Sequence, residues 1–242
     1  MDTTIIILLI IFCTGASFVQ RVCGFGFGIF IMSMLPYLMP SYGEATTLSG
    51  MLSATQSVYI LFTHYKYINW KRLIPITITF LIVSFFAIGY VANASESHLK
   101  LLLGIILILI GFYFLFINGH IQVKPTLRLQ ISMGSISGVM GGLFGMQGPP
   151  AVLYFLASEK GKEEYLAMAQ TYFLIGNVAM TLFRAHHGFL THFVCISWLY
   201  ALIGVILGSI LGKIIFDKIS ADTLRKIVYV YMILSGIVAI TS

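Results

Sequence analysis

Long apolar stretches separated by short polar connections run along the whole chain. They cover residues 3–39, 42–63, 73–93, 99–117, 127–157, 165–183, 193–215 and 224–240. Glycine-rich sequence interrupts the first stretch at 20–28 and the fifth at 141–150. A straight helix over 3–39 would be about 54 Å long, against a hydrocarbon core of about 30 Å. We therefore expect the chain to turn back at the glycines, within an all-α, polytopic membrane helical bundle.

The two halves of the chain can be aligned with each other. Matched positions are Gly24–Gly28 with Gly145–Pro149, Glu44 with Glu164, and Gly111 with Gly236. We predict two repeats, 1–118 and 125–242, each a Gly-broken segment, re-entrant or a fully crossing hairpin, followed by three spans. Three crossings after each hairpin invert the second half, so the repeats have inverted topology. Chance alignment of apolar sequence is the alternative.

Composition restricts the class of protein. Of 242 residues, 59% are hydrophobic and 9% are charged, whereas soluble domains carry about 25% charged residues. The chain is therefore expected to be a multi-pass protein of the inner (plasma) membrane, with the lipid bilayer as its partner. Its net charge of +6 comes from Lys and Arg scattered among short connections, not from a basic stripe, so nucleic-acid binding is not expected. Cys13, Cys23 and Cys195 form no ligand spacing, and we expect no metal and no cofactor.

The basic residues also predict an orientation. Connections 64–72, 118–128, 158–164 and 213–226 hold 11 of the 14 Lys and Arg residues. The inverted-repeat arrangement places all four connections inside, as the positive-inside rule requires, and both termini with the 95–100 turn outside. A count without hairpins would place 213–226 on the outer side.

Paired interruptions in corresponding segments are typical of a transporter's binding site. Where a broken segment resumes as a helix, its first N–H groups lack acceptors and favour an anion. Glycines allow a ligand or another backbone to come close, and proline suits the first helical turn. Packing through small-xxx-small spacing is the alternative for each glycine.

Arg21, beside Gln20, is the only charge that we place inside an apolar segment, and a buried cation favours an anionic ligand. Snorkelling to the interface is the alternative. Arg184 and the nearby histidines His186, His187 and His192 are assigned to a solvated interfacial connection. Amides and hydroxyls within the spans can bind an oxyanion or form interhelical hydrogen bonds. The candidate substrate-binding residues are Gln20, Arg21, Gly24, Gly26, Gly28, Gln56, Ser57, Gly145, Gln147, Gly148, Pro149, Thr171 and Asn177.

The two breaks resemble those of the sulfite exporter TauE/SafE family. The similarity covers nearly the whole chain and rests on Gly24-x-Gly-x-Gly28, on the run from Ser137 to Pro149, and on the turns Ile68-Asn-Trp70 and Gly188-Phe-Leu190. It implies export of small sulfur oxyanions or organosulfonates. Family members typically carry a run like G-I-G-G-G at both breaks. This chain departs from that run at Phe25, Phe27, Met146, Gln147 and Pro149, which leaves the substrate open.

Together these features predict a secondary transporter of a small sulfur-containing or organic anion that works by alternating access. A passive anion channel and a membrane-embedded enzyme are the alternatives. No acidic residue lies mid-span, which disfavours a cation substrate, and no HExxH or GxSxG motif is present. The sequence indicates neither the coupling ion nor the oligomeric state.

Overall fold

The computed structural model describes residues 2–116, 125–159 and 161–215, together with 226, 229–231, 233–237 and 240. Within these ranges every regular element is a helix, which confirms the all-α class. The elements are α1 (Thr3–Cys23), α2 (Phe27–Met32), α3 (Leu35–Leu38), α4 (Tyr42–His64), the 3-10 turn η1 (Tyr65–Tyr67), α5 (Trp70–Val91), α6 (Glu96–Phe116), α7 (Leu127–Phe144), α8 (Gly148–Ser158), α9 (Lys162–His186) and α10 (His192–Ile215).

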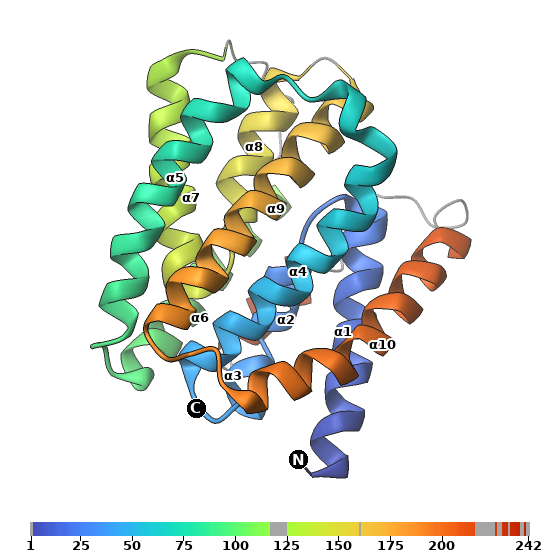
Figure 1. Ribbon diagram of the computed structural model, residues 1–242, viewed down its shortest axis with the longest axis vertical. Coiled ribbons are helices and arrows are strands. Elements are labelled where there is room, and N and C mark those ends of the chain that lie inside the picture. Colours follow the sequence, from blue (N-terminus) through green and yellow to red (C-terminus); the bar gives the residue numbers. More distant parts are fainter. Residues whose placement is uncertain are drawn as a thin grey trace.

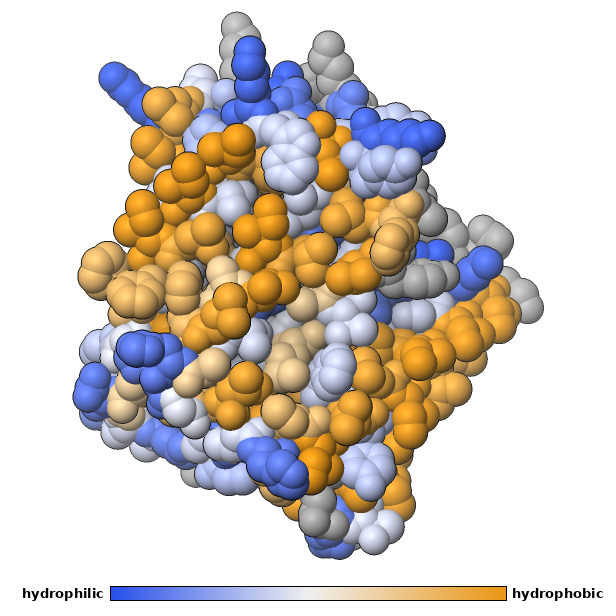
Figure 2. Space-filling model, viewed as in Figure 1, coloured by the Kyte–Doolittle hydropathy of each residue, from blue (hydrophilic) through white to orange (hydrophobic). Residues whose placement is uncertain are grey.

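Five of the described helices are long and apolar enough to cross a membrane. The candidate spans are Thr3–Val22, Trp70–Val91, Glu96–Tyr113, Glu163–His186 and His192–Ile214. Figure 2 shows a hydrophobic band across the middle of the molecule and hydrophilic groups toward its ends. Helix α4, also expected to span, is not among the five because serine, threonine and glutamine residues interrupt its apolar sequence. Most of these polar residues are buried inside the bundle, where they do not face lipid.

Glycines end the first helix of each interrupted segment. Helix α1 stops at Gly24, whose φ is 79° and whose N–H donates to the carbonyl of Gln20. Helix α7 stops at Gly145, whose φ is 67° and whose N–H donates to the carbonyl of Gly141. Only glycine adopts this left-handed conformation readily, so both helices end at these residues. Three residues separate the two helices at each break.

The two interrupted segments form hairpins that point in opposite directions. In Figure 1, α1 rises from the lower end of the molecule and α2 and α3 return toward that end. Helix α7 descends from the upper end and α8 returns to it. Inverted-topology repeats require this arrangement. The division into repeats 1–118 and 125–242 itself stays a prediction.

The first helix of each hairpin packs on a long helix of the other half, α1 on α10 and α7 on α5. Small residues permit the close approach. A Cβ on Gly204 or Gly208 of α10 would collide with the backbone of α1, at the carbonyls of Ile10 and Thr14. A Cβ on Gly134 of α7 would lie 2.7 Å from the carbonyl oxygen of Ile76 on α5. These contacts show that Gly204 and Gly208 serve close helix packing, and they interlock the two halves.

Polar contacts tie the connections together at the two ends of the bundle. At one end, Arg72 Nη1 lies 3.1 Å from Glu159 Oε2, joining the start of α5 to the end of α8. At the other end, the N–H of Tyr42 donates to Glu96 Oε1 over 3.0 Å. The start of α5 and the end of α8 therefore share one end, and the start of α6 lies at the other. This grouping matches the predicted topology.

The orientation of these ends leads to a labelling prediction. In a background without the native cysteines, a membrane-impermeant maleimide should modify His98→Cys in intact cells and Lys71→Cys only after permeabilisation, since both positions are exposed and lie at opposite ends. The reverse pattern would contradict the charge-based orientation. Labelling of both from one side would contradict the fold. Positions 160 and 218, in the predicted inside connections, lie outside the described residues.

Candidate functional site

The tips of the two hairpins touch each other inside the bundle. A Cβ on Gly28 would lie 2.7 Å from the carbonyl oxygen of Gly145 and 3.7 Å from Ser49 Oγ on α4. Real Cβ atoms essentially never come that close to a backbone oxygen. The absence of a side chain at Gly28 therefore allows the two breaks to meet.

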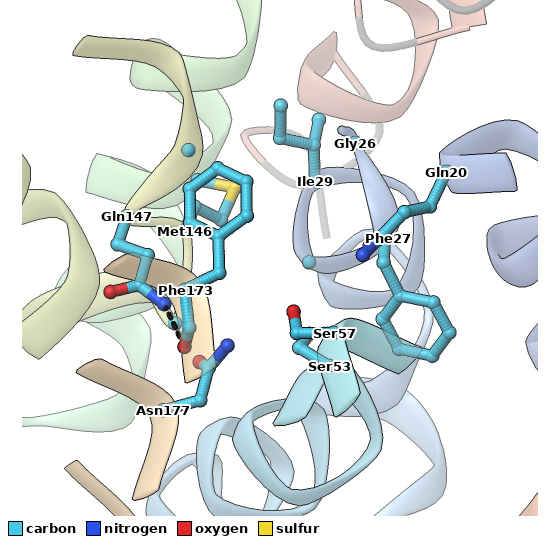
Figure 3. A pocket seen from close by; sticks show the side chains of 13 residues that line it. Gln20, Gly26, Phe27, Ile29, Ser53, Ser57, Met146, Gln147, Phe173 and Asn177 are labelled. Carbon is cyan, nitrogen blue, oxygen red and sulfur yellow. Dashed lines mark hydrogen bonds between the residues drawn. The ribbon is translucent and has the colours of Figure 1, made fainter. Parts of the chain in front are cut away.

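A cavity of about 30 Å³, enough for about two water molecules, lies at this junction. Both hairpins, α4 and α9 contribute to its wall (Figure 3). Its lining is Gln20, Gly26, Phe27, Gly28, Ile29, Ser53, Ser57, Gly145, Met146, Gln147, Gly148, Phe173 and Asn177. Eight of the thirteen predicted site residues are in this set: Gln20, Gly26, Gly28, Ser57, Gly145, Gln147, Gly148 and Asn177.

Several polar side chains in this lining have hydrogen-bonding capacity that the described residues do not use, including the Ser57 hydroxyl and the acceptor Gln147 Oε1. The amide nitrogens of Gln20 and Asn177 and the hydroxyl of Ser57 point toward the cavity in Figure 3. Within the part of the chain that the structure describes, the buried Ser57 Oγ has no hydrogen-bond partner. A buried polar group without a partner costs about 1–3 kcal/mol. Water or a ligand in the cavity would remove this cost, and amide and hydroxyl donors suit an oxyanion.

The helix that starts at the second break offers few backbone donors. Gly148 is the first residue of α8, and Pro149 and Pro150 follow it. Proline has no N–H, so only Gly148 among these three residues can donate to a ligand. The donors on this side of the cavity are therefore mainly side chains. The sequence predicted backbone N–H groups of the resumed helix instead.

Five predicted residues lie outside the cavity lining: Arg21, Gly24, Gln56, Pro149 and Thr171. Arg21 packs its Cβ and Cγ 2.8 Å from the Cβ position of Gly212 on α10. Gln56 Oε1 accepts hydrogen bonds from Ser17 and Ser209, at 3.0 and 3.1 Å. For Gln56 the structure thus favours interhelical hydrogen bonding, the alternative considered from the sequence.

Arg184 is placed differently from the sequence-based expectation. It lies within α9, is 1% exposed, and is not part of a solvated connection. Its Nη2 donates to the carbonyls of Gly141 and Gly142 at 2.8 and 3.2 Å, and its Nη1 donates to Thr46 at 3.2 Å. Arg184 thus binds carbonyl groups in the last turn of α7, directly before the second break.

Helix α9 supports both breaks from one face. Gln170 Nε2 donates to the carbonyl of Gly24 in the first break over 2.9 Å. Asn177 follows seven residues later and lines the cavity, and Arg184 follows after seven more. A spacing of seven places the three side chains on one face of a helix. This periodicity is visible in the sequence and is the signal that would have identified Gln170 and Arg184.

A second polar network holds the other side of the second break. Ser137 Oγ donates to the carbonyl of Gln147 over 2.5 Å and accepts from the Tyr172 hydroxyl over 2.7 Å. Gln147 Nε2 donates to the carbonyl of Phe173 over 3.1 Å. The break is therefore fixed by hydrogen bonds from α7 and α9. Within the described ranges, no group of His, Cys, Asp and Glu could hold a metal ion.

Comparisons with known proteins find a family of membrane transporters. The family described as sulfite exporter TauE/SafE matches residues 7–239. A probable sulfite/organosulfonate exporter TauE of Cupriavidus necator is 23% identical over 224 residues, covering 88% of this chain and 85% of the relative. A probable membrane transporter protein of Methanocaldococcus jannaschii is 31% identical over 150 residues, covering 57% and 56%. No solved structure matches the chain.

Proposed function

This chain belongs to the sulfite exporter TauE/SafE family, and we propose that it exports a small sulfur-containing or organic anion across the inner (plasma) membrane. The name of its relative in Cupriavidus necator, a probable sulfite/organosulfonate exporter, supports a sulfite or an alkylsulfonate as substrate. A secondary transporter working by alternating access fits a binding site between paired broken segments.

One observation carries this proposal: a cavity whose mixed lining includes polar side chains lies where two oppositely directed hairpins meet. Gln20, Ser57 and Asn177 supply donors from α1, α4 and α9, so a ligand held there contacts both halves of the molecule. A ligand that binds the two halves together can bias their relative movement. The three oxygens of a sulfite or a sulfonate match a site built from several neutral donors.

The contact between Gly28 and Gly145 supports alternating access. The two hairpins open toward opposite ends of the bundle, and their tips meet at the cavity (Figure 1). We propose that separating the tips on one side opens the cavity to that side while the packing on the other side stays closed. The glycines provide a contact of backbone on backbone, without side chains that interdigitate.

Flux into proteoliposomes tests the proposal. Vesicles holding the purified protein are offered labelled sulfite, thiosulfate, sulfoacetate and taurine, with acetate as a carboxylate control. We expect saturable uptake of at least one sulfur-containing anion, accelerated when the same anion is present on the other side. Saturable counterflow is the mark of a carrier, whereas uptake that neither saturates nor shows counterflow would establish the channel alternative. Uptake of none of these anions would overturn the proposed function.

A further inference from the structure

Arg184 places a positively charged guanidinium inside the bundle. Among the residues that the structure describes, no ion pair involves Arg184, and its guanidinium donates hydrogen bonds to carbonyl oxygens. Glu44, near the same end of α4, instead accepts hydrogen bonds from Thr191 and Ser41. Carbonyl groups stabilise a cation without neutralising it. A buried charge within a membrane protein is energetically costly, so its presence there indicates a functional role.

The guanidinium lies close to the cavity but outside its lining. A Cβ on Gly50 of α4 would lie 3.6 Å from Arg184 Nη1 and 3.8 Å from the carbonyl oxygen of Asn177. Ser53, one turn further along α4, and the Asn177 side chain both line the cavity. Arg184 Nη1 and the Asn177 carbonyl oxygen therefore flank the same point of α4, one turn before the cavity-lining Ser53. In so buried a region the field of the guanidinium is weakly screened.

We infer that Arg184 is a positioning residue that makes the cavity selective for anions. Its hydrogen bonds fix the carbonyls of Gly141 and Gly142 before the second break, and its positive charge lowers the energy of a negative ligand in the cavity. The ligand itself contacts Gln20, Ser57 and Asn177. The chemical class selected is a small oxyanion, and the assignment of that ligand as a transported substrate rests on the proposed function.

The alternative is that Arg184 only holds backbone carbonyls in place through its hydrogen bonds. Variants of this chain can separate that structural role from an effect of the charge. Gln170 makes the corresponding hydrogen bond to the first break through a neutral amide. Gln170→Leu therefore removes a hydrogen bond to a break without changing the charge. Arg21→Gln removes a positive charge from a position outside the cavity lining. Arg184→Lys keeps the charge but loses the planar guanidinium that reaches two helices.

The potential in the cavity can be measured without a substrate. A single cysteine is introduced by Ser53→Cys in a background without native cysteines. Its modification rates are compared for the anionic sulfonatoethyl and the cationic trimethylammonioethyl methanethiosulfonates. Access and thiol reactivity affect both reagents, so the ratio of the two rates reports mainly the local potential.

The expected result is that Arg184→Gln lowers the anion-to-cation rate ratio by about a hundredfold. Two unit charges about 10 Å apart, at an effective dielectric constant of about 20, change a rate roughly tenfold, and the reagents differ by two charges. Arg184→Lys should stay within about threefold of the unsubstituted ratio. Gln170→Leu and Arg21→Gln should leave it unchanged.

A second pair of variants tests the charge while Arg184 stays in place. The Cβ position of Gly50 faces Nη1, so Gly50→Asp should place a carboxylate against the guanidinium and lower the ratio, whereas the nearly isosteric Gly50→Asn should not. This comparison remains available if Arg184→Gln does not fold.

Three results would overturn the inference: an unchanged ratio in Arg184→Gln, an equal fall in Gln170→Leu, or equal ratios in Gly50→Asp and Gly50→Asn. The reagents report on the cavity whether or not any anion is transported. A confirmed charge effect together with absent flux would therefore overturn the proposed function alone.

Discussion

Gly28→Ala is expected to reduce anion flux to about one hundredth or less. The new methyl group would lie 2.7 Å from the carbonyl oxygen of Gly145, which belongs to the backbone and cannot rotate away. Overpacking of this kind costs about 1–3 kcal/mol, so the two hairpin tips would separate and the cavity would lose its shape. Initial flux in proteoliposomes and the melting temperature of the purified protein measure the two effects.

Two other glycines provide the controls for this substitution. Gly89→Ala on α5 should keep full flux, because the new Cβ would lie 4.0 Å from His187 Nε2, which is an ordinary contact distance. Gly148→Ala should fold normally, because its Cβ would make an ordinary 3.8 Å contact with Phe173, while narrowing the cavity. Gly208 is unsuitable as a control, because its Cβ would collide with α1. Near-normal flux in Gly28→Ala would show that the tips need not touch.

Local sequence signals predicted most of the helix boundaries. Gly24 and Gly145 mark the ends of α1 and α7 because a left-handed residue ends a helix, and this preference does not depend on the tertiary fold. Hydrophobic length required the chain to turn back at these positions. The two short helices after the first break, α2 with six residues and α3 with four, were not separated in the sequence, where 28–39 reads as one apolar run.

The candidate site was predicted less completely, because hydropathy does not reveal which neighbour covers a side chain. Arg21 and Arg184 both lie near the ends of apolar runs, and only the fold distinguishes them. Arg184 is buried under α4 and α7, whereas Arg21 lies partly buried against α10. Gln56 was expected at the cavity with Ser57, but adjacent residues of a helix point in directions about 100° apart, and Gln56 faces α1 and α10.

The most informative polar substitution is Asn177→Asp, which preserves shape and replaces a donor by a negative charge. Asn177 lines the cavity, is 3% exposed, and points its amide nitrogen toward the space between the hairpins (Figure 3). A carboxylate about 5 Å from a bound anion, at an effective dielectric constant of about 20, costs about 3 kcal/mol. We therefore expect at least a hundredfold loss of flux. Asn177→Leu, which only removes the donor, should lose about tenfold to a hundredfold, since hydrogen bonds to charged groups contribute about 1.5–3 kcal/mol.

Asn93→Asp is the matched control for the charge. Asn93 follows the end of α5 and is exposed, and its side-chain amide donates to the carbonyl of Gly89. The same isosteric change there should leave flux within about twofold, because solvent screens an exposed charge. The measurement is the concentration dependence of anion uptake, with reconstitution matched across variants. A loss in Asn177→Asp no larger than in Asn177→Leu would mean that no anion binds beside this residue, since only a charged ligand makes the added negative charge costlier than the missing donor.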